Sequence, residues 1–557
     1  MKSVYEWNKY GLMALLLAVN AAFFALMAWA LPIRFEENDD VMMCMIANGL
    51  YSGSPDAHLV YINALYGQVL AWLYTWTRAV EWYTLSFAVL HVVAMSIIDY
   101  VVLRERHSGY VKAIWLTFLY IMWVRIILSF QFTTTAGLVC LAGVLLLQRE
   151  GWRNMLGGCT LIFVASLIRF HSAALVGLLM APIIVFQWKL QWRKYVPVLV
   201  LLALVVGARW ANGQYYKSEE WQHYKEYNAI RAKLNDNPNA HAEVVYNNLP
   251  NGVMRQDYNL LLRFMPDPEI MNLEQLKAIN RFVKDVPLSQ KLLNVERLRK
   301  YALVLMTLLL FMLLVDLSEP SKKMHWFMAG YLLFVVGLLV LVSLDGFVKN
   351  RVFLCFVVPI VMAFYQLLPE QVGRKRLITM GCLTAILSVV YIVQTTKVRN
   401  DDYYQRTVVW NAFQLPLIKT LPPDSRLATA GAWFGIQFID PFHIKDFNTR
   451  KFALGWFTYI PFNKDICESY VDLMQDNMYI FVRADYQDAT SMINSIRQQM
   501  AVHYGIPTHI ELYRRNGAYA IVQLRRTEDW TMMEDIYIPS DMERYENRKA
   551  KKYRRKR

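Results

Sequence analysis

The sequence predicts a polytopic α-helical membrane protein with a C-terminal extracytoplasmic α/β domain. Of its 557 residues, 56% are hydrophobic and only 18% are charged, whereas soluble proteins average about 25% charged residues. The apolar residues gather in long runs, such as Gly11–Pro32 and Phe327–Leu344, whose length matches a bilayer core about 30 Å thick. This pattern excludes a soluble enzyme, a disordered protein and a secreted disulfide scaffold.

The membrane domain is expected to cover residues 1–394, with about 11 to 13 spans. The run 60–78 is rich in aromatic residues and contains Asn63 and Gln68, and Arg169 and His171 interrupt the pair of runs within 155–187. The candidate spans are 11–33, 60–78, 83–103, 111–128, 131–148, 155–169, 172–187, 195–211, 300–316, 326–344, 352–368 and 377–394.

Lys and Arg are concentrated in one alternating set of short loops, which the positive-inside rule assigns to the cytoplasm. The first loop, 34–59, the helical insertion 212–299 and the C-terminal segment from 395 then lie outside, and the protein is expected in the inner (plasma) membrane. Twelve full spans would instead return the C-terminus to the cytoplasm. Either 60–78 does not cross completely, or the basic loop at Arg104 violates the rule.

The segment 395–540 is predicted to be the α/β domain. Met478–Val482 resembles a strand, and Asp488–Tyr504 has helical spacing, with four apolar side chains on one face. Two further strand-like runs, His509–Tyr513 and Ala518–Leu524, flank Asn516-Gly517, a strong hairpin signal. The tail 541–557 has eight basic residues among its last ten, and we expect it to lie beside anionic lipid headgroups rather than on nucleic acid.

The cysteines argue against a metal or redox centre. Only Cys44 and Cys467 of the six lie in predicted soluble segments, and no CxxC pair is present. One disulfide between those two remains an option. Because P-loop, GxSxG, HExxH and Rossmann signatures are also absent, an ATP-driven pump is disfavoured.

The first external loop has the strongest chemical signal. Glu36, Glu37, Asp39 and Asp40 place four carboxylates within five positions. Like charges this close raise one another's pKa or attract a cation, which suits a general base or a metal ligand. The structural alternative is an acidic cap for a helix over 41–50, with Asp39 or Asp40 as its N-cap.

Two pairs of cations on the external side are candidate phosphate ligands. Arg169 and His171 lie between two short apolar runs, and Lys349 and Arg351 oppose the charge bias of the other external loops. Arg binds phosphate in a bidentate manner. The alternatives are an Arg169 that extends to the interface and a loop in which Asp345 pairs with Lys349 or Arg351.

This organisation resembles the GT-C superfamily of integral-membrane glycosyltransferases, which use polyprenyl-phosphate-linked sugars. The specific match is Asn38-Asp39-Asp40 in the first external loop, where that superfamily keeps its catalytic acid. The similarity in overall architecture extends over nearly the whole chain, but the similarity in sequence is limited to this motif of a few residues. The large insertion 212–299 departs from the simplest family plan.

The resemblance implies a transfer of sugar from a polyprenyl-phosphate donor to a glycan, lipid or protein acceptor in cell-envelope polysaccharide assembly. Asp39 or Asp40 would be the catalytic base of an inverting reaction, and Arg169, His171, Lys349 or Arg351 would bind the lipid phosphate. No cofactor is certain. A divalent cation, Mg²⁺ or Mn²⁺, held by Asp39 and Asp40 remains an option without identifiable further ligands.

Three other functions fit part of the pattern. O-antigen polymerases and ligases also use polyprenyl-linked glycans but generally lack a soluble C-terminal domain of this size. A flippase or transporter of lipid-linked sugars would predict charges deep within spans and repeated halves, and no internal repeat is visible. A non-catalytic envelope assembly factor would keep its function when Asp39 and Asp40 are replaced by Asn.

Overall fold

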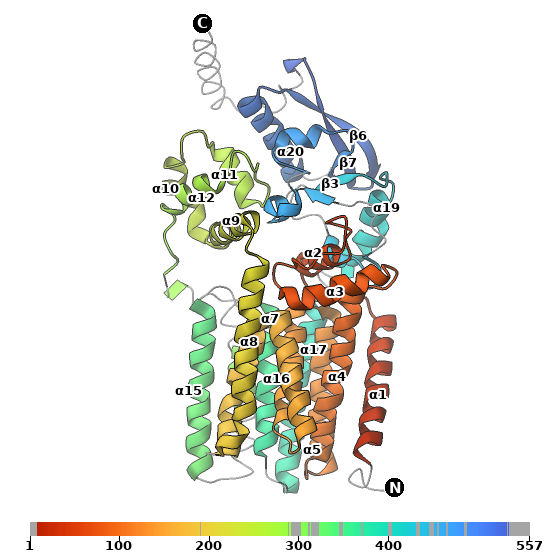
Figure 1. Ribbon diagram of the computed structural model, residues 1–557, viewed down its shortest axis with the longest axis vertical. Coiled ribbons are helices and arrows are strands. Elements are labelled where there is room, and N and C mark those ends of the chain that lie inside the picture. The colour runs from red at the N-terminus through yellow and green to blue at the C-terminus, as the bar shows by residue number, and fades with distance from the viewer. Residues whose placement is uncertain are drawn as a thin grey trace.

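The computed structural model describes a helical bundle topped by two smaller lobes (Figure 1). The described residues are 8–189, 191–287, 289–290, 302–309, 312, 322–344, 349–368, 370, 373–398, 404–429, 435–444, 451–453, 456–463, 466–483, 487–531 and 533. The predicted basic tail, residues 345–348 and eight of the 17 residues of the candidate span 300–316 therefore lie outside the described residues, while 302–309 of that span are helical.

Within these residues, six helices are long and apolar enough to cross a membrane, and three shorter apolar helices accompany them. This confirms a multi-helix membrane domain. In the described part of the chain the bundle includes the helical residues 302–309, which pack in the same core. Its longer helices are α1 (Lys9–Ala30), α4 (Trp82–Arg104), α5 (Gly109–Leu128), α6 (Phe132–Leu147), α7 (Trp152–Trp188), α8 (Val196–Tyr215), α15 (Lys322–Leu344), α16 (Asn350–Leu367) and α17 (Arg374–Val398).

Helix α7 is a helical hairpin with Arg169 at its turn. Its 37 residues would be about 55 Å long if straight, but both of its ends lie near Gln148, which directly precedes the helix and hydrogen-bonds to Gln187 at 3.4 Å. The backbone leaves the helical region only at Arg169, with φ −154° and ψ 97°. The two predicted runs in 155–187 therefore pack as antiparallel halves.

The run 60–78 is not a span. It forms α3 (Ala64–Trp76), whose 13 residues are too few to cross a bilayer core, and which lies across the top of the bundle (Figure 1). Asn63 fixes its start, because the Asn63 side chain accepts from the Leu65 N–H and the Asn63 N–H donates to the Leu167 carbonyl. Of the two explanations for the span-count conflict, incomplete crossing by 60–78 is the one the structure supports.

The helical insertion follows α8 at the same end of the bundle as α3. It is mainly helical in its described residues, as predicted, although α8 extends to Tyr215, three residues past the predicted boundary at 212. Its elements are α9 (Glu219–Asp236), the 3-10 turn Pro238–His241, α10 (Glu243–Asn247), α11 (Arg255–Leu262) and α12 (Leu273–Asn280).

The C-terminal lobe contains a five-stranded mixed sheet in the order β4-β3-β5-β7-β6. The lobe begins with the short helices α18 (Tyr404–Val409) and α19 (Leu415–Ile418). The strands are β3 (Arg426–Thr429), β4 (Lys451–Ala453), β5 (Met478–Arg483), β6 (Thr508–Asn516) and β7 (Tyr519–Arg526), and α20 (Gln487–Gln499) packs beside β5. The predicted strand, helix and hairpin are thus confirmed.

Two details of this lobe differ from the sequence prediction. The hairpin loop is Gly517-Ala518, one residue later than predicted, because Asn516 still pairs with Tyr519 and Gly517 supplies the positive φ of the turn. Cys44 and Cys467 are both free, so the disulfide option is wrong.

A buried carboxylate joins the helical insertion to the sheet lobe. Asp267, in the loop between α11 and α12, accepts a hydrogen bond from the Tyr470 N–H at 2.8 Å and one from the Tyr504 hydroxyl at 3.1 Å. Nearby, His503 contacts the buried Asp257 at 3.0 Å. The helical insertion and the sheet lobe therefore form one continuous cap over the bundle.

Candidate active site

The acidic motif lies where the first loop, 34–59, meets the bundle. Strand β1 (Arg34–Phe35) pairs in parallel with β2 (Ser129–Phe130), and α2 (Asn38–Ala47) begins directly after it. The predicted N-cap role of Asp39 or Asp40 is wrong, because the helix starts earlier and Glu37 occupies the cap position without a side-chain bond. Both aspartates lie in the first turn, where the helix dipole favours negative charge.

Asp40 is fully buried and holds three elements together. Its Oδ1 accepts a hydrogen bond from the Tyr83 hydroxyl of α4 at 2.9 Å and one from the Phe132 N–H of α6 at 3.1 Å. Its Oδ2 is buried without a hydrogen-bond partner among the described residues. Burial raises the pKa of Asp40 well above its usual value, although the Tyr83 hydrogen bond opposes that shift. These features favour a neutral, structural carboxyl.

Asp39 has a different environment. Its side chain is only partly buried, and it makes no hydrogen bond within the described part of the chain. Burial is the largest influence on the pKa of Asp39 and raises it. The positive charge of Arg351 comes next and lowers this pKa, whereas the negative charge of Glu37 raises it. The charges of Lys349 and Arg169 have smaller effects, and both lower the pKa. Asp39 thus lies within electrostatic range of three cations, Arg351, Lys349 and Arg169.

The three cations come from two distant parts of the sequence. Arg351 is in the first turn of α16, with its side chain 11% exposed, and its guanidinium lies 3.1 Å from the Glu37 carboxylate. Lys349 immediately precedes α16 and is exposed. Arg169, at the turn of α7, faces the rings of Tyr61 and Phe132 at 5.8 and 5.3 Å. The predicted pairing of Arg351 with Asp345 cannot be assessed, since Asp345 lies outside the described residues.

His171 is placed apart from this group. Its side chain is exposed, and its ring meets Phe170 edge-on at 5.6 Å. The Phe170 ring in turn carries the guanidinium of Arg209 at 4.1 Å. Of the predicted phosphate ligands, the structure therefore gathers Arg169, Lys349 and Arg351 around Asp39 and leaves His171 outside.

The acidic motif contains a third carboxyl with unusual properties. Burial raises the pKa of Glu36 to about 7, and the charge of Arg351 opposes this shift. The described residues contain no group of three or more His, Cys, Asp or Glu side chains arranged to hold a metal ion.

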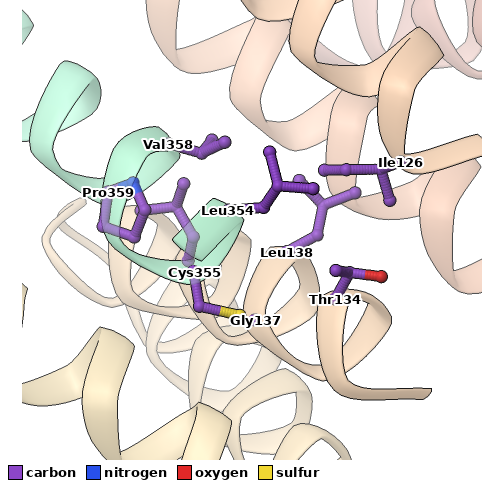
Figure 2. Close-up of a pocket in the computed structure, with 9 residues that line it drawn as sticks. Ile126, Thr134, Gly137, Leu138, Leu354, Cys355, Val358 and Pro359 are labelled. Carbon is purple, nitrogen blue, oxygen red and sulfur yellow. The ribbon is translucent and has the colours of Figure 1, made fainter. Parts of the chain in front are cut away.

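A narrow apolar pocket lies below the cations, inside the bundle. Figure 2 shows side chains of α5, α6 and α16 converging on it. Cys355 follows Arg351 by four residues in α16, which is about one helical turn. Thr134 is the polar member of its lining. The lining residues are Ile126, Thr134, Gly137, Leu138, Leu141, Leu354, Cys355, Val358 and Pro359.

Tyr61 and Arg231 were not among the site residues that the sequence predicted. Tyr61 precedes α3, and its hydroxyl lies close enough to Asp39, Arg169 and Arg231 for all three charges to influence its pKa. Arg231 is on α9, in the external insertion. A sequence signal exists for Arg231: it falls in the buried stripe Trp221, Tyr224, Tyr227, Arg231, Leu234, where helical spacing predicts an apolar residue.

Comparison with protein family models, with curated protein sequences and with solved structures finds no match for this chain.

Proposed function

We propose that this chain is a membrane glycosyltransferase that moves a sugar from a polyprenyl-phosphate donor to a glycan, lipid or protein acceptor. The reaction would take place at the external face of the inner (plasma) membrane. The observation that carries the proposal is the placement of Asp39: its carboxyl group lies within electrostatic range of Arg169, Lys349 and Arg351 at one end of an apolar bundle. This arrangement suits an anionic substrate that enters from the lipid.

In the proposed reaction, the lipid phosphate binds the cations while its hydrocarbon chain remains within the bundle or in the surrounding lipid. Arg is suited to the phosphate because its planar guanidinium donates two parallel hydrogen bonds. Neutralising the phosphate makes it a better leaving group.

Asp39 is the proposed general base. It accepts the proton of the acceptor hydroxyl as that oxygen attacks the anomeric carbon, and the bond from that carbon to the phosphate oxygen breaks. Polyprenyl phosphate leaves with the bonding electron pair, and the anomeric configuration inverts. Asp40 acts indirectly in this scheme, since its Oδ1 is engaged with Tyr83 and Phe132.

The test is sugar transfer by purified protein in lipid, with a panel of polyprenyl-phosphate sugars and labelled acceptor extracts. Wild type would be compared with Asp39→Asn and Asp40→Asn, both checked for folding. We expect Asp39→Asn to reduce turnover by about 10²-fold or more and Asp40→Asn to retain substantial activity, because the amide oxygen still accepts a hydrogen bond.

Other outcomes would redirect the assignment. Equal activity of Asp39→Asn and wild type would remove Asp39 as the base. No turnover of any donor by wild type, together with movement of the lipid carrier across liposomes, would favour a flippase. Polymerisation of a diphosphate-linked glycan would favour an O-antigen polymerase or ligase.

A further inference from the structure

Arg231 is a buried cation in the external insertion. Its side chain belongs to the inward stripe of α9 and is only 5% exposed. No carboxylate lies within ion-pair distance of its guanidinium among the described residues. A buried charge without a counter-charge is costly, so this position calls for a reason beyond packing.

Neutral amides hold the Arg231 guanidinium in place. The Asn228 Oδ1 accepts from Nε at 3.2 Å and from one terminal nitrogen at 2.6 Å, and the Asn235 Oδ1 accepts from the other terminal nitrogen at 3.2 Å. A guanidinium has five N–H donors, so two of them have no hydrogen-bond partner in the part of the chain that the structure describes. The group is oriented and still able to bind an oxyanion.

An exposed aromatic ring covers this guanidinium. The Phe264 ring lies 5.3 Å from the guanidinium carbon of Arg231 and is 43% exposed. The Phe264 backbone has φ +64°, a left-handed conformation that is rare for a bulky residue. Asn235 stabilises the adjoining turn, because its side-chain amide donates to the Leu261 and Leu262 carbonyls. The ring is therefore held at the surface beside a cation.

Tyr61 connects this pair of residues to the proposed catalytic group. A hydrogen bond joins the Tyr61 hydroxyl to Asn228, the same side chain that orients Arg231. On its other side, Tyr61 faces Arg169, and its hydroxyl is within electrostatic range of Asp39. Tyr61 and Asn228 thus lie between the Arg231–Phe264 pair and the cation Arg169.

We propose that Arg231, Asn228 and Phe264 form an acceptor subsite that binds the oxyanion of an acidic sugar. This inference rests on the proposed function and specifies its acceptor as negatively charged. The guanidinium would bind a carboxylate or a phosphate of the acceptor with its two remaining N–H donors, and the Phe264 ring would stack on the sugar face. The acceptor hydroxyl would then approach Asp39 past Tyr61.

The test measures binding by the full-length protein without any lipid donor. The probes are D-glucuronate, glucose 6-phosphate and neutral glucose at equal ionic strength, and the readout is the ligand dependence of the thermal unfolding midpoint. We expect one of the two anions to stabilise the protein and glucose to have no effect. Stabilisation by glucuronate would identify a uronic acid acceptor, and stabilisation by glucose 6-phosphate a phosphorylated one.

Substitutions show whether the anion binds at Arg231. Arg231→Gln should lower the affinity for the stabilising anion by about tenfold, as expected for the loss of a charge-assisted contact. Arg231→Lys should lower this affinity less. The matched control is Arg263→Gln, an exposed charge next to Phe264, which should have no effect. Phe264→Ala is a surface change that should preserve folding. It should lower the affinity for the sugar anion but not the affinity for inorganic phosphate.

The inference would be overturned if neither anion binds, if Arg231→Gln binds as tightly as wild type, or if Arg263→Gln weakens binding equally. If only Arg351→Gln abolishes anion binding, the anion binds at the cations near Asp39, and this result would also overturn the inference. The proposed function and the acceptor subsite can fail independently. If the protein transfers no sugar but its anion binding depends on Arg231, only the proposed function is wrong. If it transfers sugar but Arg231→Gln binds the anion as tightly as wild type, only the acceptor subsite is wrong.

Discussion

Two adjacent aspartates in this protein have different physical roles. Asp40 is buried, and Tyr83 and Phe132 donate hydrogen bonds to one of its oxygens. Asp39 is partly exposed and faces Arg351, Lys349 and Arg169. Sequence position could not separate them, since both lie in one helical turn. Packing decides, because only one of two neighbouring side chains on a helix can point at the adjoining helices.

This difference predicts opposite patterns of stability and activity. Asp40→Ala leaves the Tyr83 hydroxyl and the Phe132 N–H without their acceptor, at a cost of about 1–3 kcal/mol for each buried group. The thermal unfolding midpoint in detergent should fall accordingly. Asp39→Ala is the matched control, and its midpoint should fall less. Equal losses would show that Asp39 also has a structural hydrogen bond.

The charge of Arg351 predicts a pH effect. Burial raises the pKa of Asp39, and Arg351 is the strongest opposing influence, so Arg351→Gln should raise this pKa further. If ionised Asp39 is the base, the acidic limb of the pH–rate profile should move to higher pH.

Lys349→Gln provides the comparison, because Lys349 has a weaker influence on the same carboxyl, and its shift should be smaller. An acidic limb that does not move in Arg351→Gln would mean that another group titrates there. Glu36, with a pKa of about 7, would then be examined by Glu36→Gln.

At the scale of elements, close packing between α6 and α7 fixes the hairpin that presents Arg169. A methyl group on Gly158 would lie 2.7 Å from the Gly143 carbonyl oxygen and 2.8 Å from the Leu147 nitrogen. Neither backbone can yield without separating the helices. Small residues serve this role in membrane helix pairs.

Gly158→Ala should therefore destabilise the protein by about 1–3 kcal/mol, as overpacking does. Gly177→Ala is the control in the same helix, since nothing lies within 4 Å of its added methyl group, and alanine favours helix by about 1 kcal/mol over glycine. Thermal unfolding in detergent measures both. A Gly158→Ala midpoint equal to that of Gly177→Ala would contradict this packing.

Helix α3 is predicted to lie in the membrane interface. It buries Leu70 and Tyr74 on one face and exposes Trp72 (52%) and Trp76 (68%) on the other, and tryptophan prefers the interface. A spin label at Thr75→Cys should report a shallow depth near the headgroups. A label at Leu333→Cys, exposed midway along α15, should be deep. A deep Thr75 label would restore 60–78 as a span.

At the scale of the whole molecule, the first loop, the helical insertion and the sheet lobe share one end of the bundle. The Tyr51 hydroxyl of the first loop donates to Asn463 at 2.6 Å, and Thr84 at the start of α4 donates to the Pro441 carbonyl at 2.7 Å. The opposite end includes the Arg149–Glu105 pair. The positive-inside rule then predicts an external cap.

Cysteine labelling of intact cells would test this orientation. In a cysteine-free background, Lys217→Cys and Glu511→Cys, at exposed positions of the cap, should react with a membrane-impermeant reagent. Lys375→Cys, exposed at the start of α17, should react only after permeabilisation. The reverse pattern would place the cap in the cytoplasm and would exclude an external reaction.

The sequence by itself determined the membrane class, most helical segments, the interruption at Arg169 and the hairpin before β7. These features depend on hydrophobic length, local periodicity and turn residues, all of which are short-range properties of the chain. Only the tertiary structure decided which carboxyl faces the cations, that Arg351 approaches Glu37 and Asp39 while His171 does not, and that Arg231 lies beyond Tyr61. Those relations join segments hundreds of residues apart, and packing between helices sets them.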